Sequence, residues 1–393
     1  MDVRVPEIPE SYQGYRSRLQ AFIAANLPEL SFKPKVGLRV PDEPEDVVKL
    51  RAWVRALHEA GYVPARYSES EIDEIEEKIR VEELTKTGVP HALGNGLVAG
   101  ALKHFGTEAQ KAKYLTGLAT GEHIWTQLFS EPDAGSDLTS LQARAERDGD
   151  FFVVTGQKVW STWAQFSDYG YLLARTEPGT GRQGISAFIL DMNSPGVTTR
   201  PLREITGTTD FNEVFMDAVR IPVENLIGEV GQGWAVATAS LSEERGQVGQ
   251  SEASDPVVDL MRLAQRSLRP GGRASADAGI RQKMGALAAR SRIHRYLSYR
   301  TQTKALQGQS ELTDAPLTKI WFSETNLDLC ELGMEIQGAA GGLAEGDSRV
   351  VDEGRWQDGF LYARAWTIAG GSNEIMRNMI AERGLGLPRE PRG

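Results

Sequence analysis

The segment LFSEPDAGSD (128–137) holds the first group of residues whose types could do chemistry. A strand-like entry meets a turn rich in Pro, Asp, Gly and Ser, which exposes backbone N–H groups and the hydroxyls of Ser130 and Ser136. Donors arranged in this way can bind the polar edge of a ring or a phosphate. On local chemistry alone, however, such a turn is more often an ordinary surface loop.

A second segment, GQKVWST (156–162), places Trp160 beside the hydroxyls of Ser161 and Thr162 at the end of an expected strand. A tryptophan in this place can form one wall of a cofactor site or pack into the core, and core packing is the commoner use. The segment therefore indicates a cofactor site only in combination with other residues.

A third segment, LSEERGQVG (241–249), offers carboxylates at Glu243 and Glu244, followed by Arg245. Successive helical residues are turned by about 100°, so the two glutamates cannot share one position. In isolation both are ordinary solvated helix residues. The chain contains no HExxH, G-x-S-x-G, Walker A or CxxC motif, so its chemistry must rest on carboxylates, backbone donors or a bound organic cofactor.

The composition excludes several classes of partner. The 393 residues carry 44 Lys and Arg against 54 Asp and Glu, a net charge of -10, which supplies no positive field for a nucleic acid or an anionic membrane. Cys330 has no second cysteine to pair with, and the five histidines are scattered, so structural zinc is not expected. No apolar run approaches the ~18 residues that span a bilayer, and the N-terminus lacks the features of a signal peptide. We expect a cytoplasmic protein that binds no metal, nucleic acid or membrane.

The elements that must position these residues fall into three zones. The sequence to about residue 122 is helical: in LRAWVRALHEAGY (50–62), Leu50, Trp53, Val54, Leu57 and Ala60 lie near one helical face. From about 124 to 228, β-branched and aromatic runs are separated by turn residues without intervening helices, which favours an antiparallel barrel or sandwich. After residue 233 long helices return, as in an antiparallel bundle.

The zones predict an α+β multidomain chain, with a helical domain over 1–123, a β-domain over 124–232 and a helical bundle domain over 233–393. Strands are expected at 151–160, 169–175, 184–190 and 211–216, helices at 234–254, 280–308 and 317–338, and a loop at 269–279.

Two further sequence patterns, an acidic run and a glycine-rich segment, could suggest binding sites but have simpler structural explanations. The acidic residues between Glu69 and Glu77 accompany Ile72, Ile75 and Ile79 at helical spacing, which indicates the solvated face of an amphipathic helix. The sequence GNGLVA (94–99) fits the relaxed dinucleotide fingerprint G-x-G-x-x-A, but no strand-like run precedes it and it lies among helical sequence. It is therefore discounted as a dinucleotide site.

Segment 128–137 resembles the flavin signature of the acyl-CoA dehydrogenases, and segment 156–162 follows it in the family's order and separation. The resemblance continues through GISAFILDMNSPGV (184–197), FNEVFMDAVRIPVENLIGEVGQGW (211–234) and AGGSNEIMRNMIAERGLGLPR (369–389), and it is weakest before residue 80. It implies the acyl-CoA dehydrogenase fold, with N-terminal helices, a central β-domain and a C-terminal four-helix bundle. FAD is expected between the β-domain, the bundle and a neighbouring subunit.

The resemblance also implies which residues hold the ligands. Arg281 matches the arginine that reaches the FAD diphosphate of a neighbouring subunit, whereas Glu335 stands where many members have a glutamine facing the adenosine diphosphate. Ser136 matches a contact to FAD and to the acyl-CoA, and Arg245 and Gly371 match contacts to the substrate. The expected cofactor set is Gln127, Phe129, Ser130, Ser136, Trp160, Ser161, Thr162, Arg281, Glu335, Ser372 and Glu374.

The implied reaction removes an α-proton from an acyl thioester while a hydride leaves the β-carbon for flavin N5, giving a trans-2-enoyl-CoA. It needs one carboxylate in a dry site. In many members this glutamate lies in the C-terminal turn, where this chain has Gly370. Glu244 matches the alternative glutamate, directly before an arginine, that other branches use, so Glu244 is the candidate base. The backbone N–H of Gly370, together with a ribityl hydroxyl of the flavin, matches the donors to the thioester oxygen.

Two departures from the family's pattern concern the substrate. Glycine at position 370 leaves room in the acyl pocket, which favours a bulky, branched or ring-bearing acyl group. The loop that many members carry after the first helical segment is shortened in GYVPARYSESEIDE (61–74), which implies a more open site.

The leading interpretation is a cytoplasmic FAD-dependent acyl-CoA dehydrogenase of lipid metabolism, as in fatty acid β-oxidation. It would be a homotetramer or a dimer that passes electrons to an electron-transfer flavoprotein. The alternatives are a flavin oxidase or monooxygenase, a dehydrogenase of carrier-protein-bound acyl groups, or a non-catalytic subunit that assembles with a paralogous subunit. The presence of Glu244 and Arg245 favours the dehydrogenase.

Overall fold

The computed structural model describes residues 9–31, 40–67, 73–179, 181–247, 256–307, 309–343 and 346–389, and within helix α6 it leaves out the side chains of residues 242–247. Contacts divide this part of the chain into two compact units, one ending at Glu243 and the other beginning at Glu244. None of the described helices is both long and apolar enough to cross a membrane.

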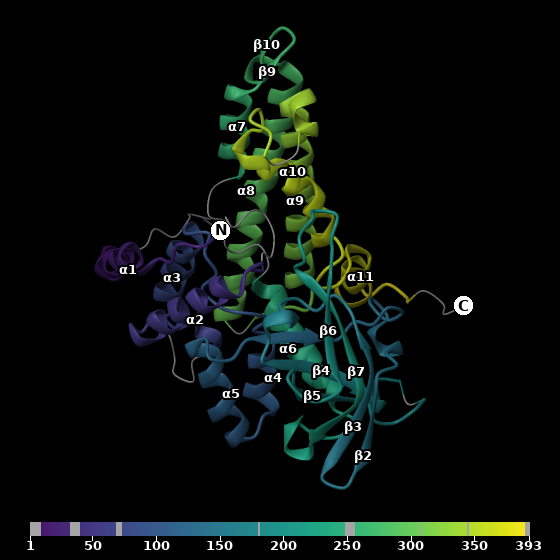
Figure 1. Ribbon diagram of the computed structural model, residues 1–393. Coiled ribbons are helices and arrows are strands. Elements are labelled where there is room, and N and C mark those ends of the chain that lie inside the picture. The colour runs from purple at the N-terminus through teal and green to yellow at the C-terminus, as the bar shows by residue number, and fades with distance from the viewer. Residues whose placement is uncertain are drawn as a thin grey trace. The chain divides into compact units, whose positions relative to one another are not determined.

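The first unit begins with helices whose apolar faces share one core. In α2, Leu50, Trp53, Val54 and Leu57 are buried, as their spacing predicts, whereas Ala60 follows the last helical residue and is exposed. Residues 69–72 of the acidic run lie outside the described residues. The helices before the sheet are α1 (Gln13–Asn26), α2 (Pro44–Glu59), α3 (Glu74–Lys86), α4 (Val98–Phe105) and α5 (Glu108–Thr120), all visible in Figure 1.

Helices α3 and α5 start where side chains satisfy the first free N–H groups. Asp73 accepts hydrogen bonds from the N–H groups of residues 75 and 76 at the start of α3. Thr107 and Gln110 form a reciprocal capping box at the start of α5. The expected amphipathic helix is therefore present in α3, where Ile79 and Leu84 are fully buried.

The middle of the chain forms one eight-stranded sheet in the order β6-β7-β3-β2-β4-β5-β8, with β1 paired to β4. The strands expected at 169–175 and 184–190 lie within a residue of their predicted places, whereas the last long strand extends from 211 to 222. The strands are β1 (Trp125–Leu128), β2 (Arg144–Asp148), β3 (Phe151–Lys158), β4 (Tyr169–Arg175), β5 (Ile185–Asp191), β6 (Val197–Leu202), β7 (Phe211–Pro222) and β8 (Leu226–Ile227).

Most pairs in this sheet are antiparallel, as expected, but β4 has two parallel neighbours. It pairs with β1 over four residues, from Trp125 opposite Tyr169 to Leu128 opposite Leu172, and with β2 at Arg144 opposite Arg175. The sequence pattern predicts pairing between consecutive strands only, so these two parallel pairs were not expected. The β2–β3 hairpin lies between β1 and β4 in the chain, which gives the long connection that parallel pairing requires.

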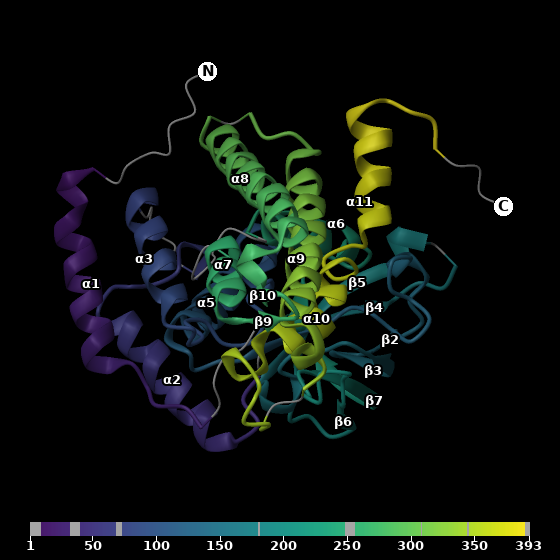
Figure 2. The ribbon, with the colours of Figure 1, turned by 90° about the horizontal axis from the view of Figure 1, so that it is seen from above.

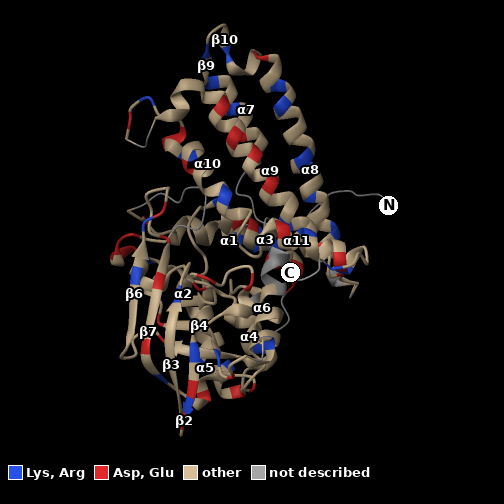
Figure 3. Cartoon of the chain, turned by 90° about the vertical axis from the view of Figure 1, so that its right-hand side faces the viewer, with Lys and Arg blue, Asp and Glu red and all other residues tan. Residues whose placement is uncertain are grey.

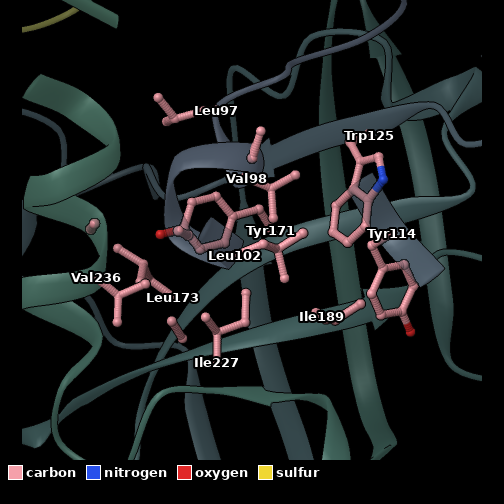
Figure 4. Close-up of a cluster of buried hydrophobic side chains, with 14 of the residues drawn as sticks. Leu97, Val98, Leu102, Tyr114, Trp125, Tyr171, Leu173, Ile189, Ile227 and Val236 are labelled. Carbon is pink, nitrogen blue, oxygen red and sulfur yellow. The ribbon is translucent and has the colours of Figure 1, made fainter. Parts of the chain in front are cut away.

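Strands β4 and β5 are buried on both faces, and this explains their almost continuous apolar sequences. Tyr171, Leu173 and Ile189 face a cluster shared with α4, α5 and α6 (Gly233–Gln247). Figure 4 shows these side chains together with Trp125 from β1. Leu172 and residues alternating with it face a second cluster, formed mostly by strand residues. Because α4, α5 and the sheet share this core, the helices and the sheet belong to one compact unit.

In the second unit, helices α7 (Pro256–Arg266), α8 (Ala278–Leu306), α9 (Asp314–Gln337) and α10 (Arg355–Trp366) pack around one apolar cluster. Figure 2 shows α8 and α9 side by side along their length. Where the sequence predicted only a loop at 269–279, the chain forms a small hairpin of β9 (Leu268–Arg269) and β10 (Gly272–Arg273). The last helix described is α11 (Asn373–Met379), followed by a short π-helical turn.

Charge is segregated between α8 and α9. Helix α8 contains seven Lys and Arg residues and no Asp or Glu, whereas α9 contains five acids and one lysine. Figure 3 shows the blue and red positions on the two helices. Among the described residues, four ion pairs join them in antiparallel register: Lys283 with Glu335, Arg290 with Asp328, and both Arg300 and Lys304 with Asp314.

Helix α9 is also fitted closely to α10. A Cβ placed on Gly333 would lie 2.3 Å from a ring carbon of Trp356, which is itself buried in the core of the second unit. Only glycine leaves room for the indole at this point of α9.

Candidate functional site

The loop that follows β1 is held by a buried ion pair. The Nζ atom of Lys158 lies 2.7 Å from Oε1 of Glu131 and donates a second hydrogen bond to the carbonyl of Phe129 at 3.0 Å. Lys158 is fully buried and Glu131 nearly so. The carboxylate also accepts the N–H groups of Gln142 and Ala143, at 2.6 and 2.9 Å. Both carboxylate oxygens of Glu131 are therefore engaged, which is the condition for burying a charge.

The same loop is tied to β3 and closed on itself by the main chain. The N–H of Val159 donates to the carbonyl of Ser130, while Glu131 and Ala134 exchange two backbone hydrogen bonds. The position of the polar segment 128–137 is thus fixed at both its entry and its turn. Burial lowers the pKa of Lys158 to about 8, and the neighbouring Glu131 carboxylate acts against that shift.

Trp160 projects from the end of β3 in an unusual conformation. Its φ is 61°, in the left-handed region that non-glycine residues rarely adopt, and the residue is 60% exposed. Its ring makes an edge contact with Phe211, with ring centroids 5.9 Å apart. The next residue, Ser161, exchanges two backbone hydrogen bonds with Asn212, which hold the strained turn in place. A large aromatic side chain kept at the surface by a strained backbone is a feature of binding sites.

The structure brings several expected cofactor residues of the first unit to the surface around this loop. Gln127, Ser130 and Thr162 are partly exposed, and Ser136 is exposed. Phe129 and Ser161 differ, because both are buried. The ring of Phe129 packs edge-on against the ring of Tyr171, with ring centroids 4.9 Å apart. The hydroxyl of Ser161 has no hydrogen-bond partner among the described residues. These two residues support the site from beneath and do not present side chains on it.

The residues on this surface fit a flavin ring. An exposed indole offers a flat apolar face, while the hydroxyls of Ser130 and Thr162 and the amide of Gln127 can bond to polar ring atoms. A separate groove of about 520 Å³ lies beside the loop, between Glu131, Ala134, Gln142 and Gly156. Neither Trp160 nor Gln127 lines it, so the groove is distinct from the aromatic surface.

In the second unit, the expected C-terminal turn carries two successive glycines with positive φ, 66° at Gly370 and 92° at Gly371. A Cβ on Gly371 would lie 2.5 Å from the terminal methyl of Met376, whereas a Cβ on Gly370 would have no neighbour within 4 Å. Ser372 follows and caps α11, since its hydroxyl accepts the N–H of Ile375 at 3.3 Å. Glu374 is exposed in the first turn of this helix.

A second buried lysine anchors this turn. The Nζ atom of Lys319 on α9 donates to Oδ1 of Asn373 at 2.8 Å, and the hydroxyl of Ser323 donates to the same oxygen at 3.0 Å. Burial lowers the pKa of Lys319 to about 8. The residues that follow Gly371 are therefore fixed to the bundle by hydrogen bonds to one amide.

The remaining expected residues of the second unit lie at the start of α8 and the end of α9. Arg281 is exposed. The carboxylate of Glu335 is engaged by Lys283, whose Nζ lies 2.6 Å from Oε2 in a largely exposed ion pair. The backbone of Glu244 and Arg245 is helical, in the last turns of α6, and their side chains lie outside the described residues.

Three supporting residues were not predicted from the sequence: Lys158, Glu131 and Lys319. A signal for Lys158 was present, because Phe152, Val154 and Lys158 share one face of an alternating strand and the first two are plainly core residues. A lysine on the buried face needs a buried acceptor. The partner could not be read from the strand alone.

Comparisons with known proteins match the whole chain to one family. Models of the N-terminal, middle and C-terminal domains of acyl-CoA dehydrogenases match residues 37–122, 126–219 and 231–385. Acyl-CoA dehydrogenase IpdE1 of Mycobacterium tuberculosis is 35% identical over 397 residues, which cover 98% of this chain and 100% of that protein.

Solved structures resemble the chain over almost its full length. The structure of the Tcur3481-Tcur3483 steroid ACAD matches with a TM-score of 0.81 at 27% identity, covering 99% of this chain and 100% of that one. The ChsE4-ChsE5 complex from Mycobacterium tuberculosis matches with a TM-score of 0.81 at 25% identity, with the same coverage.

Proposed function

The chain belongs to the acyl-CoA dehydrogenase family, whose members are FAD-dependent oxidoreductases, and from this premise we propose how it acts on its substrate. The reaction converts an acyl-CoA thioester into the trans-2-enoyl-CoA. Bound FAD supplies the hydride acceptor, at N5 of the ring. The observation that supports this assignment best is the exposure of Trp160. Its side chain is 60% exposed, its backbone is strained, and it lies beside the signature loop (128–137), where a flat ring needs an aromatic wall.

The proposed base is Glu244. Position 370, which holds the glutamate in many relatives, is glycine here and has no group that takes a proton. Glu244 then removes the α-proton, and a neighbouring Arg245 contacts the acyl-CoA. The N–H of Gly370 donates to the thioester carbonyl as negative charge develops on its oxygen. Gly371 contributes to the same substrate contact, and Ser136 contacts both ligands from the β-domain.

Each unit has its own set of proposed cofactor contacts. In the first unit, the proposed contacts come from Gln127, Ser130, Thr162 and the ring of Trp160. In the second, Arg281 reaches the diphosphate of FAD in a neighbouring subunit, consistent with its exposed position. The other proposed contacts are made by the main chain of Phe129 and Ser161, whose side chains are buried, and by Glu335, Ser372 and Glu374.

We propose a bulky, ring-bearing acyl group as the substrate. Within its unit, Gly370 has no heavy atom within 4 Å of the place a Cβ would occupy, so the side chain lost at this position has not been replaced by a neighbour. The solved relative Tcur3481-Tcur3483 is named as a steroid ACAD. A straight short chain would leave such a space unfilled, which costs contact energy.

The assembly is proposed to be a homotetramer or dimer, with an electron-transfer flavoprotein as the acceptor of electrons. The ChsE4-ChsE5 structure is a complex of two different chains, and this favours a paralogous subunit as the second candidate partner. We retain 1–123, 124–232 and 233–393 as the proposed domains. A cytoplasmic location and a place in lipid oxidation complete the proposal.

The test is anaerobic mixing of the purified protein with a panel of acyl-CoAs while the flavin absorbance is followed. Ring-bearing thioesters should bleach the flavin faster than straight short chains. Glu244→Gln should slow bleaching by at least about 100-fold, as expected for the loss of a general base, and Glu243→Gln is the matched control. Bleaching that survives Glu244→Gln would refute the base, whereas no bleaching by any thioester would favour an oxidase or a non-catalytic subunit.

A further inference from the structure

The sequence GNG at 94–96, discounted as a dinucleotide fingerprint, has a specific place against β1. A Cβ on Gly94 would lie 2.3 Å from the carbonyl oxygen of Trp125, and a Cβ on Gly96 would lie 2.2 Å from the hydroxyl of Tyr67. Gly94 therefore lets the main chain approach β1 closely, and Gly96 lets it pass beside Tyr67. The N–H of Asn95 donates to the Trp125 carbonyl at 2.6 Å, which fixes Asn95 beside the strand that leads into the signature loop.

The side chain of Asn95 has only one favourable orientation. Its Oδ1 accepts the backbone N–H of Leu97 at 2.9 Å. Because that N–H can only donate, the oxygen must face it, and the NH₂ group must face the other way. The amide orientation of Asn95 is thus set by the backbone.

Asn95 in turn orients Gln127. Nδ2 of Asn95 donates to Oε1 of Gln127 at 2.9 Å. The carboxamide oxygen of Gln127 is therefore occupied, and its NH₂ group is directed away from Asn95. This nitrogen has no protein partner among the described residues, and Gln127 is partly exposed. The backbone N–H of Leu97 thus determines, through two amides, that Gln127 offers donors to a ligand.

We propose that Asn95 is a positioning residue which fixes the carboxamide of Gln127 so that it presents hydrogen-bond donors, and not an acceptor, to the flavin ring. The inference rests on the proposed role of Gln127 in the flavin site. The polar edge of an oxidised flavin consists mainly of acceptors, two carbonyl oxygens and two unprotonated ring nitrogens, beside a single N–H. A fixed donor suits this edge, whereas an amide oxygen turned toward it would be repelled.

Asn95→Asp is the sharpest test, because it reverses the orientation without removing the contact. One carboxylate oxygen can still accept the N–H of Leu97, and the other then faces Gln127. Gln127 must turn its NH₂ group toward Asp and its oxygen toward the flavin. Asn95→Ala removes the bond but imposes no orientation, so its effect should be smaller. Asn193→Asp is the matched control, since Asn193 lies in an exposed turn of the same unit.

The first measurement is FAD affinity, from titration of apoprotein, together with the visible spectrum of the bound flavin. Asn95→Asp should raise the dissociation constant by about tenfold or more, which corresponds to the loss of one hydrogen bond, and should shift the flavin bands. Asn95→Ala should give a smaller change, and Asn193→Asp should give none. In a Gln127→Met background, Asn95→Asp should have little further effect.

The second measurement is independent of the flavin. The side-chain amide resonances of Gln127 in the ¹⁵N-labelled apoprotein, assigned by their absence in Gln127→Met, should shift on Asn95→Asp and not on Asn193→Asp. Unshifted resonances would overturn the inference, and so would an Asn95→Asp effect on FAD that persists in full in the Gln127→Met background. If FAD binds but no acyl-CoA bleaches it, the proposed function fails while the orientation of Gln127 stands.

Discussion

The ammonium of Lys158 and the carboxylate of Glu131 form an ion pair 2.7 Å long from which solvent is excluded. Each partner also binds main-chain groups: Lys158 binds the carbonyl of Phe129 in the signature loop, and Glu131 binds the N–H groups of residues 142 and 143 ahead of β2. The pair therefore links the end of β3, the loop after β1 and the approach to β2. Because its charges depend on each other, changing one partner should cost more than changing both.

Lys158→Met should lower the free energy of unfolding by about 3–5 kcal/mol, since it leaves the Glu131 carboxylate buried without a counter-ion. The double variant Lys158→Met with Glu131→Gln removes the charge and keeps one acceptor for the loop, so it should recover part of this loss. FAD affinity should remain weakened in both variants, because the Phe129 carbonyl has lost its donor. Urea denaturation and FAD titration measure the two effects. Equal stability of the single and double variants would contradict this account of the pair.

The pair also predicts a pH dependence. Burial lowers the pKa of Lys158 to about 8, whereas an unfolded lysine titrates near pH 10.4. Between these values the folded protein binds fewer protons than the unfolded one, so this residue makes the free energy of unfolding rise with pH. The cost of burying its charge is fully present below pH 8 and is relieved as the proton leaves. The difference in unfolding free energy between wild type and Lys158→Met should therefore increase by roughly 2–3 kcal/mol from pH 8 to pH 10. A flat difference across this range would show that Lys158 keeps its proton.

Trp160 and Trp163 allow a matched comparison within one turn. Both have positive φ, 61° and 66°, but Trp160 is 60% exposed and Trp163 only 5%. Trp160→Gly relieves the backbone strain and loses little burial, so the free energy of unfolding should stay level or rise by up to about 1 kcal/mol. Trp163→Gly should lower it by at least about 3 kcal/mol through loss of core contacts. FAD affinity should fall in Trp160→Gly despite its stability, and unchanged affinity would remove Trp160 from the flavin site.

The two glycines of the C-terminal turn should respond differently to substitution. Gly370→Ala faces only the strain of a positive φ and should cost about 1 kcal/mol of unfolding free energy. Gly371→Ala meets the same strain and also the methyl of Met376, 2.5 Å from the new Cβ, so it should cost more. Adding Met376→Ala to Gly371→Ala should remove the clash without removing the strain. Chemical denaturation of these variants measures the differences, and equal costs at 370 and 371 would contradict them.

Elements with a strong local pattern were the ones that the sequence predicted well. Strand β4 lies at 169–175, as its apolar run indicated, and α2 buries the face that its spacing defined. The hairpin at 268–273 was missed because only two residues pair in each strand, too few to leave a pattern. The parallel pairing of β1 with β4 was missed because it joins strands that are not consecutive.

Residues of the candidate site also differ in how far the sequence alone could predict their roles. Trp160 was expected as a cofactor wall only through the family resemblance, and its exposure could not be inferred from an aromatic residue type that is usually buried. Asn95 had no signal as a supporting residue, because its role depends on Gln127, 32 positions away, and on the orientation of two amides. Such information is carried by hydrogen-bond direction, which residue spacing does not contain.

Ion pairs between α8 and α9 can form in more than one axial alignment of the two helices, whereas the contact between Gly333 and Trp356 can form in only one. Sliding α9 by one turn would bring Glu331 opposite Lys283 and Glu324 opposite Arg290, so opposite charges would still meet at these two places, although Ser310 would replace Asp314. The space above Gly333 has no such duplicate one turn away, because the neighbouring positions 329 and 337 carry Leu and Gln. The charges can thus select the antiparallel direction of the two helices early in folding, while a single missing methyl group decides the axial alignment in which they finish.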